Sequence, residues 1–323
     1  MLANFILQAQ NYQKFDLVAP AGYLGFSEHE ELNLSLHTDG HTYDATLTPH
    51  AMSQLLLKLG SRWKNGCPQQ FVLGLPSEIR VPTLEFLRDN YAISNRKKQD
   101  LFFRSVNPTE TALNVRAVFT DRYEVVDNDE ILPILDDVLE DTTNETLFGL
   151  EKRPLVLKGS YVDQDQMSIR VMVETPDLPQ YGAGFVVKSS EIGGSIMVLP
   201  FIQRRSCQNS TVFGESSFKK RHIGDASFIR ESLTNAIQDA FSKMPVYLKK
   251  IKKAETEEIP VFTEYAASLF KDAKLPDYAE ADFWYGTENE TTKMGLVNGF
   301  THAAKSLQPD QRLAMEIFAG GLL

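Results

Sequence analysis

Residues 184–206 are GFVVKSSEIGGSIMVLPFIQRRS. Runs of β-branched and aromatic residues stand on both sides of a polar turn at 189–194 that contains two glycines. Such runs, bounded by glycine and serine, are typical of paired strands. The runs at 155–157 and 167–173 have the same character, and turn residues separate them. The sequence therefore predicts an antiparallel sheet from Pro154 to Cys207.

A second β signal lies earlier in the chain. Apolar and polar residues alternate over 32–37 and again over 42–47, and Asp39-Gly40 stands between the two runs. Asp-Gly in this position is a strong hairpin signal, because a type I′ turn needs positive φ at both central residues. We therefore expect a β-hairpin here, followed by a helix that Thr48 caps.

The chain after Gly224 has a helical pattern. Apolar residues recur at helical spacing from Phe228 to Phe241, as on the buried face of an amphipathic helix. The stretch 249–259 is charged and linker-like. Further helices are predicted over 260–270, 292–306 and 309–318.

Together these signals predict an α+β fold, with a mostly antiparallel sheet packed against helices and a helical C-terminal third. We expect one domain over 1–323, with a sheet-rich part at 20–210 and a helical part at 225–323. The helix Phe228–Phe241 is expected to pack on the sheet, with both Phe228 and Leu233 buried.

The composition is that of an ordinary globular chain. Of the 323 residues, 42% are hydrophobic and 24% are charged, which excludes a disordered chain. Two cysteines cannot form a disulfide framework or a structural zinc site. The longest apolar stretch, 196–202, is much shorter than the about 20 residues that cross a bilayer, and residues 1–15 lack the features of an export signal. We therefore expect a cytoplasmic protein with no membrane partner.

The net charge of −10 is unevenly distributed. Residues 121–151 hold eleven acids and one base, whereas residues 188–253 hold twelve bases and five acids. A protein that is acidic overall can still bind a polyanion if its cations converge, because screening limits the reach of distant charges to about 10 Å. Two interpretations stay open: the charged runs are solvated surfaces, or they bind partners.

Part of the acidity has a structural cause. Asp127 and Glu130 have the spacing of a capping box, and a helical apolar stripe begins at Ile131. Acids near a helix N-terminus are favoured by the helix dipole.

The common catalytic and metal-binding motifs are absent from the sequence. There is no glycine-rich phosphate loop, no dinucleotide fingerprint, no nucleophile elbow and no His-Glu-x-x-His. Four of the six histidines lie between His29 and His50. A two-residue hairpin turn would place His37 and His41 on opposite faces, where they cannot share one ion. We predict no metal site and no cofactor, and we assign no catalytic residue.

Basic residues stand beside aromatic ones at the end of the last predicted strand and in the segment after it. Single-stranded nucleic acid needs this combination, since cations bind phosphates and each stacked base adds about 1–3 kcal/mol. The alternative is that the rings are core residues and the cations are solvated. The residues concerned are Arg204, Arg205, Lys219, Lys220 and Arg221 as cations, and Phe201 and Phe218 as stacking rings.

The same region carries a family resemblance. Its motifs are Ser-Glu-x-Gly at 190–193, Pro200-Phe201, the Arg–Cys–Asn strand end up to Asn209, and Arg221-His222-x-Gly224. With Asp121-Arg122-Tyr123 and Gly-x-x-Asn-x-x-Thr at 295–301, their order resembles the phage/plasmid-like protein family catalogued as domain of unknown function 932. The resemblance covers roughly residues 20 to 320, and Gln208 before Asn209 departs from it.

The resemblance implies a setting but no established activity. It places such chains in phage and plasmid genomes beside recombination and replication genes, and therefore in a host-cell cytoplasm. It adds His222, Arg122 and Tyr123 to the candidate nucleic-acid-binding residues. The residues that the family pattern retains are Asp121, Arg122, Tyr123, Glu191, Gly193, Pro200, Arg204, Asn209, Arg221, His222, Gly224 and Asn298.

We expect a non-enzymatic nucleic-acid-binding protein, with single-stranded DNA annealing or a recombination accessory role as its specific form. Annealing would need a homo-oligomer, formed through the helical last third. The alternative is a protein-interaction module that blocks or recruits a host factor through the acidic segment Asp121–Glu151. A third hypothesis is an enzyme that uses Asp121, Glu191 and His222 for acid–base chemistry.

Overall fold

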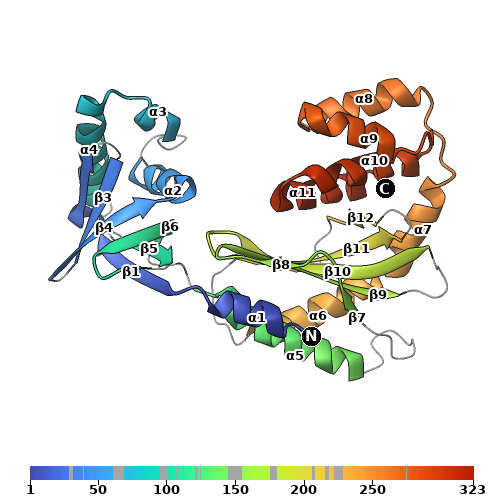
Figure 1. Cartoon of the computed structure of the whole chain (residues 1–323), viewed down its shortest axis with the longest axis horizontal. Helices are drawn as coiled ribbons and strands as arrows, with labels where there is room; N and C mark the ends of the chain where they lie inside the picture. The colour runs from blue at the N-terminus through green and yellow to red at the C-terminus, as the bar shows by residue number, and fades with distance from the viewer. Residues whose placement is uncertain are drawn as a thin grey trace.

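The chain forms two β-sheets, each covered by its own helices (Figure 1). The structure is a computed structural model. It describes the chain outside residues 29–31, 39, 61–68, 95–99, 107, 121–122, 124, 145–154, 175–179, 206–207, 215–217, 222–227 and 274, and it describes only the backbone at 69–70, 94, 142–144, 174 and 218–221.

The first sheet has six strands in the order β1-β5-β6-β4-β3-β2. Neighbouring strands are antiparallel except β4 and β6, which are parallel. The strands are β1 (Lys14–Pro20), β2 (Leu24–Glu28), β3 (Leu32–Thr38), β4 (His41–Leu47), β5 (Asp100–Val106) and β6 (Ala112–Thr120). The helices α2 (Pro49–Leu59), α3 (Gln69–Leu73) and α4 (Ser77–Ser94) lie together beside this sheet. Leu36, Leu55 and Phe103 are fully buried in its core.

The predicted hairpin is confirmed as β3 and β4. Thr38 pairs with His41 and His37 with Thr42, and Gly40 has a φ of 88°, which glycine adopts readily. The side chain of Thr48 accepts a hydrogen bond from the N–H of Ala51 and caps α2, as the sequence predicts.

The second sheet is entirely antiparallel and follows the order β12-β11-β10-β9-β7, with β13 also paired to β11 and β8 to β9. This confirms the sheet predicted over Pro154–Cys207. Its strands are β7 (Leu155–Leu157), β8 (Tyr161–Val162), β9 (Gln166–Glu174), β10 (Tyr181–Ser190), β11 (Ser195–Arg204), β12 (Asn209–Val212) and β13 (Phe218–Arg221).

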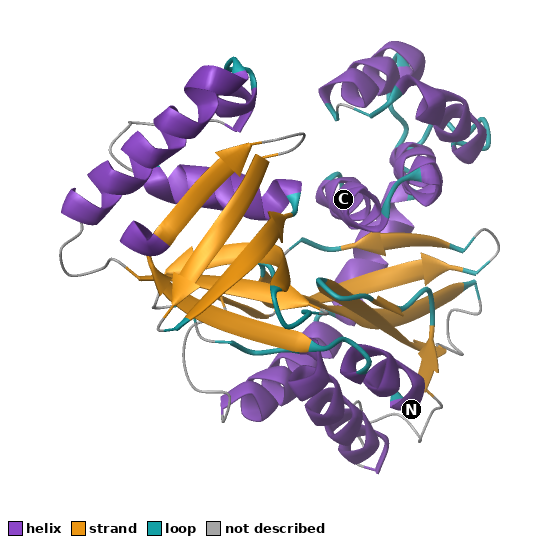
Figure 2. Ribbon diagram, turned by 60° about the vertical axis from the view of Figure 1, so that its left-hand side comes forward, coloured by secondary structure: helices purple, strands orange, loops and turns teal. Residues whose placement is uncertain are grey.

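Helices cover both faces of the second sheet (Figure 1). One face carries α1 (Ala3–Gln10), α5 (Asn128–Asn144) and α6 (Ile229–Ser242). The other face carries α10 (Lys293–Ala303) and α11 (Pro309–Gly321), and α7 (Met244–Ala254) runs beside the end of the sheet. The other helices within the described residues are α8 (Phe262–Asp272), α9 (Glu280–Gly286) and the short 3₁₀ helices Ala21–Tyr23, Asp277–Ala279 and Ala304–Ser306. Figure 2 shows the two sheets meeting near the centre of the molecule.

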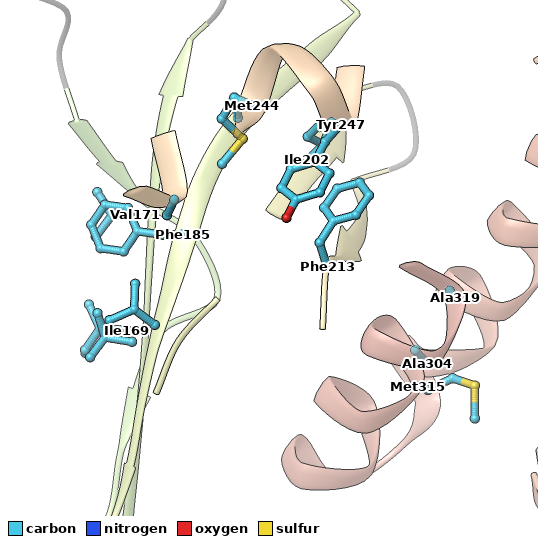
Figure 3. Packing of buried hydrophobic residues seen from close by; sticks show 14 of the residues in the cluster. Ile169, Val171, Phe185, Ile202, Phe213, Met244, Tyr247, Ala304, Met315 and Ala319 are labelled. Carbon is cyan, nitrogen blue, oxygen red and sulfur yellow. The ribbon is translucent and has the colours of Figure 1, made fainter. Parts of the chain in front are cut away.

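Aromatic side chains join the second sheet to its helices. Phe185 of β10 meets Phe241 of α6 edge to face, with ring centroids 5.5 Å apart. Phe213 stacks on Tyr247 of α7 with centroids 3.8 Å apart (Figure 3). Each large side chain buried in this way stabilises the fold by about 1.5–3 kcal/mol.

The α+β class and the helical last third, which spans 229–321, are both confirmed. The core pattern of α6 is confirmed at Leu233, which is fully buried, but it is wrong at Phe228, which is 59% exposed. Phe228 lies at the N-cap of α6, before the helix can turn its side chain toward the sheet. The linker expected over 249–259 is wrong in its first half, because α7 continues to Ala254 and buries Ile251.

The two sheets have separate main cores, and the expectation of one domain over 1–323 stays a prediction. Within the described residues, no helix is long and apolar enough to cross a membrane.

Candidate functional site

Eight charged side chains meet where the two sheets join, and we call them the junction cluster. They come from β1, β5 and β6 of the first sheet, from the start of α5, and from turns next to β9 and β10 of the second sheet. The members are Lys14, Asp16, Arg104, Arg116, Asp127, Asp129, Asp165 and Glu191.

A β-bulge directs the side chain of Arg116 into the junction cluster. Arg104 of β5 pairs with Ala117 of β6, but the next residue of β5 pairs with Val115, so that Arg116 has no partner across the strands. Bulges redirect side chains and occur often beside functional sites. Here the guanidinium of Arg116 reaches Glu191 at 2.6 Å and Asp165 at 3.4 Å.

Glu191 is the most enclosed carboxylate of the cluster, at 1% exposure. Its Oε1 accepts hydrogen bonds from the backbone N–H of Asn128 at 2.7 Å and from Lys14 at 3.2 Å, and its Oε2 accepts one from Arg116. Both oxygens are therefore occupied and shielded from solvent. This arrangement links both sheets to the start of α5.

Arg104 is fully buried and donates to two carboxylates, Asp127 at 2.5 Å and Asp16 at 3.2 Å. Burial raises the pKa of Asp127, but the charges of Arg104 and Lys14 outweigh it, so that this pKa lies below its ordinary value. For Asp16 burial is the stronger effect, and its pKa lies above its ordinary value in spite of Arg104. The same guanidinium thus contacts one carboxyl group whose pKa is lowered and one whose pKa is raised.

Tyr123, predicted as a nucleic-acid contact, lies at the junction cluster. Its ring stacks on Phe119 with centroids 3.7 Å apart, and its hydroxyl donates to the carbonyl of Glu191 at 3.2 Å. Burial is the main cause that raises the pKa of Tyr123 to about 12. Phe119 covers one face of the ring, and that face is closed to a base. Gly193, which the family pattern retains, packs on Phe119 with a φ of 115°.

The predicted cations follow one edge of β11 but do not form a single cluster. One edge of β11 is paired with β10; the other carries β13 opposite residues 195–198 and β12 opposite residues 201–204. Lys219 and Arg221 therefore lie at one end of this edge and Arg204 at the other. At about 3.3 Å per residue, they are roughly 23–30 Å apart. We call this edge, with Arg204, Arg205, Lys219, Lys220 and Arg221, the basic edge.

Arg204 and Arg205, whose side chains are described, already make some contacts within the protein. Arg204 forms an ion pair with Glu288 at 3.3 Å, and both side chains are partly exposed. The backbone N–H of Arg205 bonds to the carbonyl of Gln180, while its Nε is buried without a hydrogen-bond partner among the described groups. Arg122 and His222 lie outside the described residues, and at 219–221 only the backbone is described.

Phe201 is wrong as a stacking residue. It is fully buried in a small core with Leu199 and Leu313 of α11. Helices cover both faces of the second sheet, so that Phe201 would be buried on whichever face of β11 its side chain lay. The nearby Asn209, which the family pattern retains, pairs with Arg204 across the strands and donates to the carbonyl of Asn298 at 3.3 Å.

The described acids of the segment 121–151 are mostly bound within the protein. Asp127 and Asp129 belong to the junction cluster, and Glu130 accepts the N–H of Asp127 as a capping box requires. The exposed carboxylates Asp137 and Asp141 both bind Arg230 of α6. A host-protein partner for this surface stays a prediction.

Five members of the junction cluster were not identified from the sequence as functional candidates: Lys14, Asp16, Arg104, Arg116 and Asp165. One feature of the sequence could have identified such residues: a charged residue within an otherwise apolar strand, as Arg104 is within residues 101–106. In the described part of the chain, no group of three or more His, Cys, Asp and Glu residues is arranged to bind a metal ion.

Comparison with protein-family models, curated proteins and solved structures finds no match to this chain.

Proposed function

We propose that this protein binds single-stranded nucleic acid along the basic edge of β11, as part of phage or plasmid DNA metabolism. The observation that supports the proposal is the register of the second sheet, which sets Arg204 and the β13 cations near opposite ends of the side of β11 that pairs with β12 and β13. Cations roughly 23–30 Å apart suit an extended strand of several nucleotides better than one small anion. Single-strand-binding folds cover about 4–16 nucleotides per site.

The burial of Phe201 changes the expected mode of binding. Without this ring, phosphate contacts carry most of the affinity, and these contacts are independent of sequence and sensitive to salt. The ion pair between Arg204 and Glu288 is partly exposed. Such pairs are worth only about 0–1 kcal/mol, so that a phosphate can replace Glu288 at little cost.

Fluorescence anisotropy with labelled oligothymidylate, titrated at several salt concentrations, tests the proposal. We expect tight binding at low salt and a slope of log K against log salt of about −0.7 for each phosphate contact. Arg205→Ala and the double variant Lys219→Ala/Lys220→Ala should each weaken binding and flatten this slope.

Arg230→Ala is the matched control, because Arg230 is an exposed arginine on α6 that binds Asp137 and Asp141. It should bind as the unchanged protein does. If the unchanged protein does not bind single strands at low salt, the proposal is wrong. Equal losses in the Arg230 control and in the basic-edge variants would also contradict it.

A further inference from the structure

A cavity of about 200 Å³ lies between the β8–β9 end of the second sheet and the start of α11. Figure 1 shows one end of α11 above β8. Because β10 separates β9 from β11, this cavity is distinct from the basic edge and does not depend on the proposed function. The residues that line it are Gly159, Tyr161, Arg170, Leu307, Pro309 and Arg312.

Two arginines of the cavity surround one buried carboxylate. Arg170, which is 5% exposed, binds Glu316 through both terminal nitrogens at 3.2 and 2.6 Å. The Nε of Arg312 binds the same carboxylate at 3.0 Å, and Glu316 itself is 1% exposed. The three side chains together carry one excess positive charge. The side chain of Arg312 is 32% exposed, so that this excess charge can be reached by an anion from solution.

The cavity also offers unused hydrogen-bond donors. An arginine has five N–H donors, and among the described side chains Arg312 donates only to Glu316, through Nε. Tyr161 adds a hydroxyl group. Burial, followed by the nearby charges of Asp310 and Asp163, raises the pKa of Tyr161 to about 12, so that the hydroxyl is protonated at neutral pH.

The two acids near the cavity have partners of their own. Asp310 binds Lys188 at 2.6 Å. Burial raises the pKa of Asp310, but the hydrogen bonds from Lys188 and Gln166 outweigh burial, so that the pKa of Asp310 lies below its ordinary value. Asp163 accepts the backbone N–H groups of Asp165 and Gln166 at 2.8 and 2.7 Å. Neither carboxylate contributes to the pairing of the arginines with Glu316.

We propose that this cavity binds a phosphate-type oxyanion. The planar fork of a guanidinium matches phosphate oxygens in pairs, and Arg170, Arg312 and Tyr161 present donors to one small space. The cavity is smaller than the about 300–1,000 Å³ of sites for drug-sized ligands. The ligand is therefore inorganic phosphate, or the phosphate group of a small monoester whose remainder stays in solvent.

Isothermal titration of the full chain with sodium phosphate, in a chloride buffer of matched ionic strength, tests the proposal. We expect saturable binding and a melting temperature that rises with phosphate concentration, because a ligand that binds only the folded state stabilises it. A parallel titration with adenosine monophosphate distinguishes the sources. Tighter binding of the nucleotide supports a monoester ligand, and equal or weaker binding supports phosphate alone.

Two variants test whether the ligand contacts Arg312 and Tyr161 of the cavity. Arg312→Gln retains the pair between Arg170 and Glu316 and should weaken phosphate binding about tenfold or more, since a charge-assisted hydrogen bond is lost. Tyr161→Phe should cause a smaller loss and carries the test if Arg312→Gln does not fold. Arg230→Gln, an exposed arginine away from the cavity, should bind phosphate normally. No saturable binding to the unchanged protein, or unchanged affinity in both cavity variants, would overturn the proposal.

Discussion

Two carboxylates share one buried guanidinium, and their surroundings move their pKa values in opposite directions. Asp127 lies next to both Arg104 and Lys14, whereas Asp16 bonds to Arg104 alone among the described cations. Lys14 adds a second strong attraction at Asp127, whereas at Asp16 burial is the largest effect and repulsion from Asp127 adds to it. The pKa of Asp127 is consequently lowered and that of Asp16 is raised.

Asp127→Asn and Asp16→Asn form a matched pair, because each removes one charge next to Arg104 and preserves shape. We expect Asp127→Asn to lower the free energy of unfolding by about 3 kcal/mol, as for a broken buried ion pair. Asp16→Asn should change it by less than about 1 kcal/mol, because burial already disfavours the charged form of Asp16. Urea unfolding measures both. Equal losses would contradict this description of the junction cluster.

The same residues set a pH dependence. The folded-state pKa of Asp127 lies below its ordinary value of 3.8, so that its stabilising effect is complete above that pH and is lost as the pH falls through the folded-state pKa. The contribution of Asp16 to stability has the opposite sign. Its pKa is raised, so that its charged form destabilises the folded state, and protonation at acidic pH removes this destabilisation. We expect Asp127→Asn to reduce the loss of stability on the acid side. Urea midpoints of the unchanged protein and the variant, measured from neutral pH to below 3.8, check this, and parallel curves would contradict it.

At the scale of the element, α6 gives the sharpest comparison between neighbouring side chains. Leu233 is fully buried against the second sheet, and Phe228 at the start of the helix is 59% exposed. Leu233→Ala should cost about 2–5 kcal/mol of unfolding free energy, because it leaves a cavity in a packed core. Phe228→Ala should stay within about 0.5 kcal/mol, as is usual for exposed positions. Thermal or urea unfolding decides the matter, and a large loss for Phe228→Ala would show that its ring is buried.

Local patterns were sufficient for elements whose partners are close in sequence. The hairpin around Gly40 and the stripe through Leu233 follow from turn chemistry and periodicity alone. The junction cluster could not be predicted in this way, because Lys14 and Glu191 are 177 residues apart and Arg116 reaches its partner only through a bulge. The face on which Phe201 lies could not be predicted either, since helices cover both faces of its sheet.

At the scale of the whole molecule, two separate main cores meet at a group of ion pairs, and the helical last third packs on the second sheet. If single-strand annealing is the task, this helical part should mediate self-association, because an annealing surface must hold more nucleotides than one chain covers. Light scattering with and without single-stranded DNA measures this. A rise in protein mass beyond one chain would support annealing, whereas one chain per particle under both conditions would exclude it and leave simple binding.

The path of the amino-terminal segment has a consequence for how the protein is made. Leu2 is fully buried in the core of the second sheet, and α1 packs on α5, yet β1 immediately after it belongs to the first sheet. More than a hundred residues separate Gln10 from Asn128, and a ribosome needs on the order of ten seconds to add them. During synthesis, the first sheet can therefore form before α5 and the second sheet are available to bury the apolar side of α1.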